Sequence, residues 1–141
     1  MLHAMIMAGG GGTRFWPRSR IKRPKQFLQL TGDRTLLQMA VDRIEAQVTP
    51  DRTWIITSAL HREEAARQLP QLPADRVVGE PCGRDTAACI GLGAALIARQ
   101  DPNAVMLVYP DSGHGSLSQF HESFTRQAGA FLASDSPFAP Y

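Results

Sequence analysis

Short apolar runs and amphipathic stretches alternate along the chain. Four runs are dominated by apolar and β-branched residues and predict buried strands: residues 2–7, 53–58, 76–79 and 104–109. Helical spacing or helix-favouring composition predicts helices in four others: residues 35–48, residues 61–69, a small-residue stretch beginning at Asp85 or Thr86, and residues 116–134. The alternation of strand and helix predicts an α/β fold with a doubly wound, mostly parallel sheet.

Local signals mark where these elements begin and what they pack against. Residues 35–38 read Thr-Leu-Leu-Gln, the form of a capping box at a helix start. Glycine and alanine in the stretch after Thr86 predict a helix whose backbone another group can approach closely. Trp16 and Phe27 are predicted to lie in the core.

Composition bounds the class of protein. With 141 residues, 43% of them hydrophobic and 20% charged, the chain has the balance of an ordinary globular domain with one core. No apolar run approaches the roughly 20 residues of a membrane span, and glycines interrupt the N-terminal run before a signal-like segment is complete. The expected location is therefore the cytoplasm. Cys82 and Cys89 match no zinc-site spacing and are predicted to be buried free thiols.

The strongest chemical signal follows the first predicted strand. Four consecutive glycines occupy positions 9–12, where a backbone free of Cβ atoms can approach an anion. Residues 1–32 hold six cations and no carboxylate, whereas the remaining residues hold nine cations and thirteen carboxylates. Backbone amides beside fixed cations suit a polyphosphate.

Two common phosphate-binding patterns do not fit this segment. Counted from Gly9, the P-loop pattern Gly-x-x-x-x-Gly-Lys-Ser/Thr meets Arg14 at its second glycine and Phe15 at its lysine. The dinucleotide pattern Gly-x-Gly-x-x-Gly also meets Arg14 at its last glycine. The segment therefore belongs to neither class.

Residues 9–20 and 23–27, Gly-Gly-Gly-Gly-Thr-Arg-Phe-Trp-Pro-Arg-Ser-Arg and Arg-Pro-Lys-Gln-Phe, resemble the signature of sugar-nucleotide pyrophosphorylases. The variant with Trp-Pro and Pro-Lys-Gln-Phe resembles the mannose-1-phosphate guanylyltransferases. That family joins GTP and mannose 1-phosphate into GDP-mannose and releases pyrophosphate. The resemblance implies a Rossmann-like nucleotidyltransferase fold.

The resemblance also implies roles for individual residues. Lys25 would lie over the reacting phosphates, and Arg14 would act with it as a catalytic group. The β- and γ-phosphates would be held by Arg14 and by the backbone amides of five residues: Gly9, Gly10, Gly11, Gly12 and Thr13. The implied reaction is an in-line attack by mannose 1-phosphate on the α-phosphorus, driven by positioning and charge.

A second block, residues 79–90, resembles the family's Gly-Glu-Pro and Arg-Asn-Thr-Ala-Ala segment, with Asp85 in place of the commoner Asn. By that resemblance Glu80, Arg84 and Thr86 lie near the guanine and ribose. Glu80 is the most informative, because a carboxylate can accept from guanine N1–H and N2–H together. The alternative for this block is a tightly packed core helix.

Residues 110–114, Pro-Asp-Ser-Gly-His, follow the last predicted strand, where an acid could hold Mg²⁺ beside a triphosphate. Asp111 is the candidate ligand. The family pattern is Pro-Ala-Asp-His, and an ungapped match puts Ser112 at its metal position. That Asp111 is an ordinary turn residue therefore stays open.

In the family, the nucleotidyltransferase domain continues for about as long again and supplies the sugar pocket, longer than a usual single domain. We therefore expect residues 1–134 to form its nucleotide-binding half, incomplete on the C-terminal side, and residues 135–141 a frayed tail. The expected partners are GTP and mannose 1-phosphate, with no nucleic acid and no membrane. Self-association into a homo-oligomer is left open.

Three classes of function stay open from the sequence. The first is a mannose-1-phosphate guanylyltransferase that needs the C-terminal half for activity, with a pyrophosphorylase for another sugar 1-phosphate as its runner-up. The second is an inactive or regulatory GTP-binding fragment, which the altered acidic segment favours. The third is a nucleic-acid-binding module, which the glycines among the cations and the scarcity of aromatic residues argue against.

Overall fold

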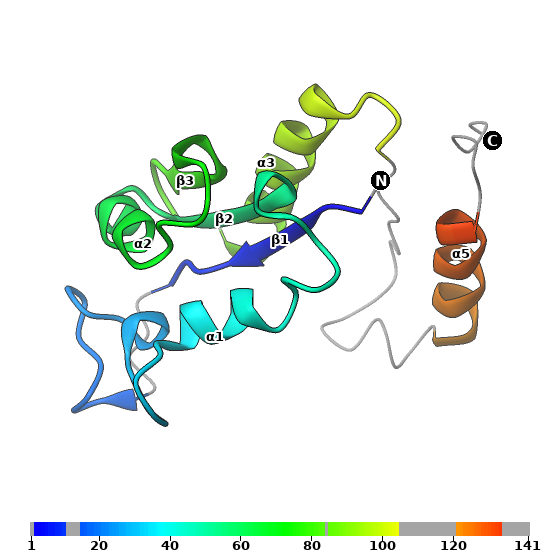
Figure 1. The fold of residues 1–141 in the computed structure, drawn as a ribbon. Coiled ribbons are helices and arrows are strands. Elements are labelled where there is room, and N and C mark those ends of the chain that lie inside the picture. The colour runs from blue at the N-terminus through cyan, green and yellow to red at the C-terminus, as the bar shows by residue number, and fades with distance from the viewer. Residues whose placement is uncertain (1, 11–14, 84, 105–120, 134–141) are drawn as a thin grey trace. The chain divides into compact units, whose positions relative to one another are not determined.

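The computed structural model describes residues 2–10, 15–83, 85–104 and 121–133 (Figure 1). The chain divides into two compact units, Met1–Ala95 and Leu96–Tyr141. The helix His121–Ala133 (α5) lies in the second unit, within the predicted helix 116–134. Within the described parts of both units, no helix is long and apolar enough to cross a membrane.

A parallel sheet of three strands forms the centre of the first unit. The strands are Ala4–Met7 (β1), Thr53–Ser58 (β2) and Val77–Glu80 (β3), in the order β1-β2-β3. Met7 pairs with Ile56, and Ser58 pairs with Glu80. The predicted parallel α/β sheet is confirmed for these strands. Residues 105–109 of the fourth predicted strand lie outside the described residues.

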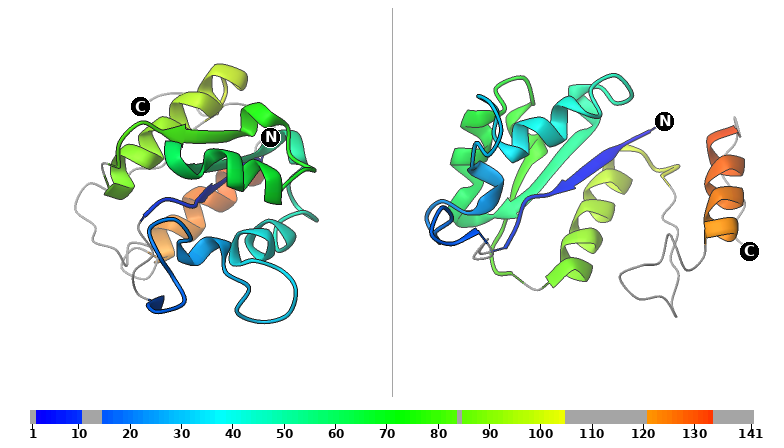
Figure 2. Two further views of the ribbon diagram at one scale, coloured as in Figure 1. Left: turned by 90° about the vertical axis from the view of Figure 1, so that its left-hand side faces the viewer. Right: turned by 90° about the horizontal axis from the view of Figure 1, so that it is seen from below.

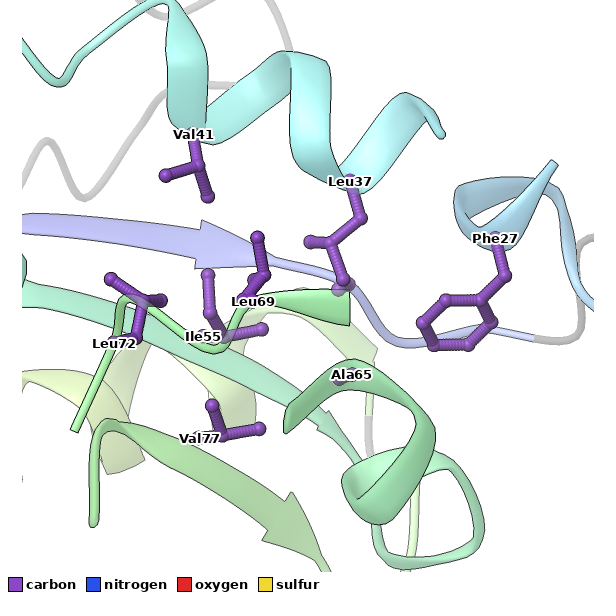
Figure 3. Packing of buried hydrophobic residues seen from close by; sticks show 9 residues of the cluster. Phe27, Leu37, Val41, Ile55, Ala65, Leu69, Leu72 and Val77 are labelled. Carbon is purple, nitrogen blue, oxygen red and sulfur yellow. The ribbon is translucent and has the colours of Figure 1, made fainter. Parts of the chain in front are cut away.

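The helices Leu36–Asp42 (α1) and Arg62–Gln68 (α2) cover one face of the sheet. Figure 3 shows Leu37 and Val41 of α1 directed toward Ile55 of β2, and Leu69 and Val77 belong to the same cluster. Every one of these side chains is less than 5% exposed. Phe27 is buried in the same cluster, as predicted.

The helix Asp85–Gln100 (α3) begins in the first unit, where its residues 85–95 cover the opposite face of the sheet (Figure 2). Ile6 packs against the α1 and α2 cluster, so the neighbouring Met5 points to the other side of β1. A Cβ atom added to Gly93 of α3 would lie 1.9 Å from the sulfur of Met5. The absence of a side chain at Gly93 therefore lets α3 approach the sheet.

Helix α1 begins as predicted and ends early. The Thr35 hydroxyl accepts from Gln38 N–H, and the Gln38 side chain accepts from Thr35 N–H, which completes the capping box. The predicted helix reached residue 48, but α1 ends at Asp42 and the chain continues in turns. Ile44 N–H bonds to Val41 O, three residues back, and these tighter turns still bury Val48.

Two predictions about burial are wrong. The Trp16 side chain is 73% exposed, because it lies in the cation-rich loop, where the Arg20 guanidinium stacks 5.6 Å from its ring centre. Cys82 is also exposed, since it lies in the loop between β3 and α3, whereas Cys89 is buried in α3 as predicted.

Candidate nucleotide-binding site

The glycine segment leaves the sheet at the carboxyl end of β1. Ala8 N–H donates to Ile56 O at 2.7 Å, which extends the β1–β2 pairing one residue beyond Met7. Gly9 and Gly10 then follow, both exposed, and Gly10 has a φ of +93° that a residue with a side chain rarely adopts. The first half of the predicted phosphate-binding segment therefore lies at the edge where parallel sheets bind ligands.

Glu80 lies at the same edge, at the end of β3. A Cβ atom built on Gly9 would lie 3.4 Å from Glu80 Oε2, so the carboxylate is close to the backbone of the glycine segment. The structure thus brings together two of the motifs that the sequence singled out.

Cys89 of α3 lies close enough to Glu80 for the charge of the carboxylate to affect the thiol. Burial, and secondarily the negative charge of Glu80, raise the pKa of the Cys89 thiol above its usual value of 9.0. The thiol therefore stays protonated at neutral pH.

Lys25 begins a short 3-10 turn, Lys25–Phe27 (η2), whose backbone lies near the start of the glycine segment. Its neighbour Gln26 donates from Nε2 to Ala8 O at 2.6 Å. Phe27 is buried and meets His61 edge to face, with ring centres 5.6 Å apart. Lys25 is half-buried. Because Gln26 is bonded to Ala8 and Phe27 is packed against His61, the backbone at Lys25 is held near the start of the glycine segment.

The remaining predicted site residues are less fully defined. Thr86 is exposed in the first turn of α3, and Asp85 before it has a φ of +60°, a conformation that Asp and Asn tolerate better than most residues. Six lie outside the described residues: Gly11, Gly12, Thr13, Arg14, Arg84 and Asp111. In the part that is described, no three His, Cys, Asp or Glu side chains gather to hold a metal ion.

Two residues to which the sequence analysis assigned no site role bond to the backbone where the glycine segment begins. Gln26 and Thr57 both donate to the carbonyl of Ala8, at 2.6 and 3.0 Å. Thr57 carried only a weak signal, a hydroxyl directly after the apolar pair Ile55-Ile56, because Thr53 and Ser58 of the same strand carry hydroxyls too. Gln26 carried another, its place between Lys25 and a core phenylalanine in the Pro-Lys-Gln-Phe motif.

A cavity of about 540 Å³ lies on the α1 and α2 side. Glu64 in its wall accepts from Arg67 Nε at 3.0 Å and from Gln68 Nε2 at 2.6 Å. Partial desolvation opposes ionisation of Glu64, but these hydrogen bonds and the charges of Arg67 and Arg23 outweigh it and hold its pKa below the usual 4.5. Gly9, Lys25 and Glu80 are not among the described residues that line this cavity.

Comparison with known families agrees with this arrangement of a glycine segment, a lysine and a carboxylate at the carboxyl edge of a parallel sheet. The nucleotidyl transferase family model matches residues 3–131. The chain belongs to the nucleotidyl transferase family. The resemblance found in residues 9–27 is confirmed at this level.

Curated relatives carry more specific names. The chain is 42% identical to mannose-1-phosphate guanylyltransferase ManC of Salmonella typhimurium over 111 residues, 76% of this chain and 23% of that protein. It is 41% identical to a mannose-1-phosphate guanylyltransferase of Escherichia coli K12, with the same coverage of both. It is 38% identical to the alginate biosynthesis protein AlgA of Pseudomonas fluorescens over 75% of this chain and 22% of that one.

A solved structure supports the fold assignment. It comes from Thermus thermophilus and is described as a mannose-1-phosphate geranyltransferase. The TM-score is 0.60 at 39% sequence identity, over 71% of this chain and 29% of that one. The predicted α/β nucleotidyltransferase fold is thereby confirmed. The chain spans about a quarter of the length of these relatives.

Proposed function

We propose that this chain is the nucleotide-binding part of a mannose-1-phosphate guanylyltransferase. Membership of the nucleotidyl transferase family supports transfer of a nucleotidyl group. The names of the relatives support GTP and mannose 1-phosphate as substrates. The observation that carries the proposal is the carboxylate of Glu80 beside Gly9, because it puts an acceptor for a purine base next to a segment suited to phosphates.

In the proposed reaction, a phosphate oxygen of mannose 1-phosphate attacks the α-phosphorus of GTP. The bond from that phosphorus to the oxygen bridging the β-phosphate breaks, and pyrophosphate leaves with the electron pair. Lys25 neutralises charge on the reacting phosphates, and the amides of Gly9 and Gly10 donate to phosphate oxygens together with Gly11, Gly12, Thr13 and Arg14. The attacking oxygen is already ionised, so the chain needs no general base.

Guanine recognition is assigned to the block that begins at Glu80. A carboxylate accepts from N1–H and N2–H of guanine at once, and adenine lacks this pair of donors. Thr86 and Arg84 are proposed to complete the contacts to base and ribose.

Mg²⁺ is the proposed cofactor, with Asp111 as its ligand, and when bound it would neutralise triphosphate charge. Residues 110–114 also favour a second candidate function, a chain that binds GTP without transferring its nucleotidyl group. Ser112 occupies the position where an ungapped match to the family pattern requires the metal-binding carboxylate. A serine hydroxyl cannot replace the charge of that group.

Calorimetric titration of the 141-residue chain with GTP tests the proposal, with ATP as the control and circular dichroism to establish folding. Saturable binding of GTP, tighter than that of ATP and strengthened by Mg²⁺, is expected. GTP binding that Mg²⁺ does not affect would favour the second candidate. A folded chain that binds neither nucleotide would overturn both.

A further inference from the structure

The backbone carbonyl of Ala8 receives two side-chain hydrogen bonds from different parts of the fold. Gln26 Nε2 donates from η2 at 2.6 Å, and Thr57 Oγ1 donates from β2 at 3.0 Å. Ala8 is 3% exposed, Gln26 is 7% exposed and Thr57 is fully buried. Water does not compete for these bonds, so the orientation of the carbonyl is well defined.

Fixing this carbonyl also fixes the next amide. The peptide bond is planar and trans, so the Ala8 C=O and the Gly9 N–H lie in one plane and point in opposite directions. Ala8 N–H is already held by Ile56 O at 2.7 Å. Both backbone polar groups of Ala8 are therefore constrained just before Gly9.

The side chain of Gln26 carries a free-energy cost that shows it does more than fill space at this position. Gln26 Oε1 is buried and has no hydrogen-bond partner among the described residues. A buried unpaired acceptor is destabilising by about 1–3 kcal/mol, which an apolar side chain of similar size would avoid. The position therefore uses the amide as a donor to Ala8.

We infer that Gln26 and Thr57 are positioning residues that aim the Gly9 N–H at a phosphate group and fix the Lys25 segment relative to it. This inference rests on the proposed binding of GTP. Preorganised amide donors bind an anion more tightly than donors that must reorient, because no ordering cost falls on the binding step. Gln26 adds the link to Lys25, its immediate neighbour in η2.

Strand β2 offers a matched control for the threonine. Thr53 is also buried, and its hydroxyl donates to Thr49 O at 3.1 Å at the opposite, amino end of the strand. Thr57→Val and Thr53→Val each replace a buried hydroxyl by a methyl group of the same shape. Thr57→Ser keeps the donor, and Gln26→Met removes the other donor with little change of volume.

The test compares GTP with GMP, because GMP lacks the phosphates assigned to the glycine amides. We expect Thr57→Val and Gln26→Met each to raise the dissociation constant for GTP about tenfold, the loss of one charge-assisted contact. The dissociation constant for GMP should change by less than about twofold. Thr57→Ser keeps the donor and should bind GTP as tightly as wild type. Thr53→Val should lower the urea midpoint as much as Thr57→Val and leave the GTP constant unchanged.

Each other outcome has one meaning. If wild-type chain does not bind GTP, the proposed function fails and the inference fails with it. If wild-type chain binds and both variants bind equally well, only the positioning role is overturned. Equal losses for GTP and GMP, or an equal loss in Thr53→Val, would reduce Thr57 to a structural role. Should Thr57→Val not fold, Gln26→Met decides between the same outcomes.

Discussion

Gly9 and Glu80 lie in near contact, since a methyl group on Gly9 would come to 3.4 Å from Glu80 Oε2. Gly9 follows β1 and Glu80 ends β3, the two outer strands of the three-stranded sheet. Neither residue belongs to a pattern that fixes this distance by sequence spacing. The sheet brings them together because β1 and β3 both run parallel to β2 and end at one edge. The segment proposed to bind phosphate and the carboxylate proposed to accept from the base thereby become parts of one candidate site.

Lys25 is expected to contribute to GTP affinity through its position, beyond its charge alone. Lys25→Gln should raise the GTP dissociation constant about tenfold or more, because a charge-assisted contact in a partly desolvated site is lost. Lys22→Gln removes the same charge three residues earlier, from an exposed turn. It should change the constant by less than about twofold. Equal effects of the two substitutions in calorimetry would show that only overall charge matters.

Helix α3 offers two glycines with opposite expected responses to alanine. Gly91 has no neighbouring atom within 4 Å of an added Cβ, so Gly91→Ala should stabilise the chain by about 0.5–1 kcal/mol through helix propensity. An added Cβ on Gly93 meets the flexible side chain of Met5, which must move aside, so Gly93→Ala should be less stable than Gly91→Ala by about 1 kcal/mol. Urea unfolding measures both, and equal stabilities would contradict the packing of α3 on β1.

The pH dependence of stability should include Glu64. Its pKa lies below the usual 4.5 in the folded chain, so its ion pair stabilises the fold above that pH and the contribution is lost as the pH falls through the folded pKa. The effect should be small, because the Arg67 partner is largely exposed. Urea midpoints between about pH 6 and pH 3 should fall less in Glu64→Gln than in wild type. Unchanged pH dependence in that variant, matching the control Glu63→Gln, would contradict the assignment.

The two thiols should react at very different rates. Cys82 is exposed, whereas Cys89 is buried with a raised pKa, and only a thiolate attacks a disulfide reagent. One thiol should react rapidly in the folded chain and the second only after unfolding. Cys82→Ser should remove the rapid phase. A rapid phase that persists in this variant would show that α3 does not bury Cys89.

The sequence patterns predicted the elements that local physics determines. Three strands, the capping box at Thr35 and the burial of Phe27 follow from hydrophobic runs and from side chains that bond within their own helix. The end of α1 at Asp42 could not be predicted from such local patterns. The spacing of apolar residues up to Val48 fits a helix, and it fits equally well the tighter turns that bury the same side chain.

The candidate site divides in the same manner. Residues 9–27 and 79–90 carried recognisable motifs, so Gly9, Lys25 and Glu80 could be named before their positions were known. The shared carbonyl at Ala8 could not be predicted, because Gln26 and Thr57 meet it across long stretches of chain. Hydrophobic patterns record which positions are buried and carry no information about the partner of a buried hydroxyl or amide.

The most direct test of the proposed recognition of guanine is the preference for GTP over ATP in wild type and in Glu80→Gln, measured by calorimetry under identical conditions. Glu63→Gln, at an exposed position of α2, is the matched control. Wild type and the control should prefer GTP, and Glu80→Gln should lose about tenfold or more in GTP affinity with ATP affinity unchanged. A GTP preference that survives in Glu80→Gln would contradict the assignment of Glu80 to the base.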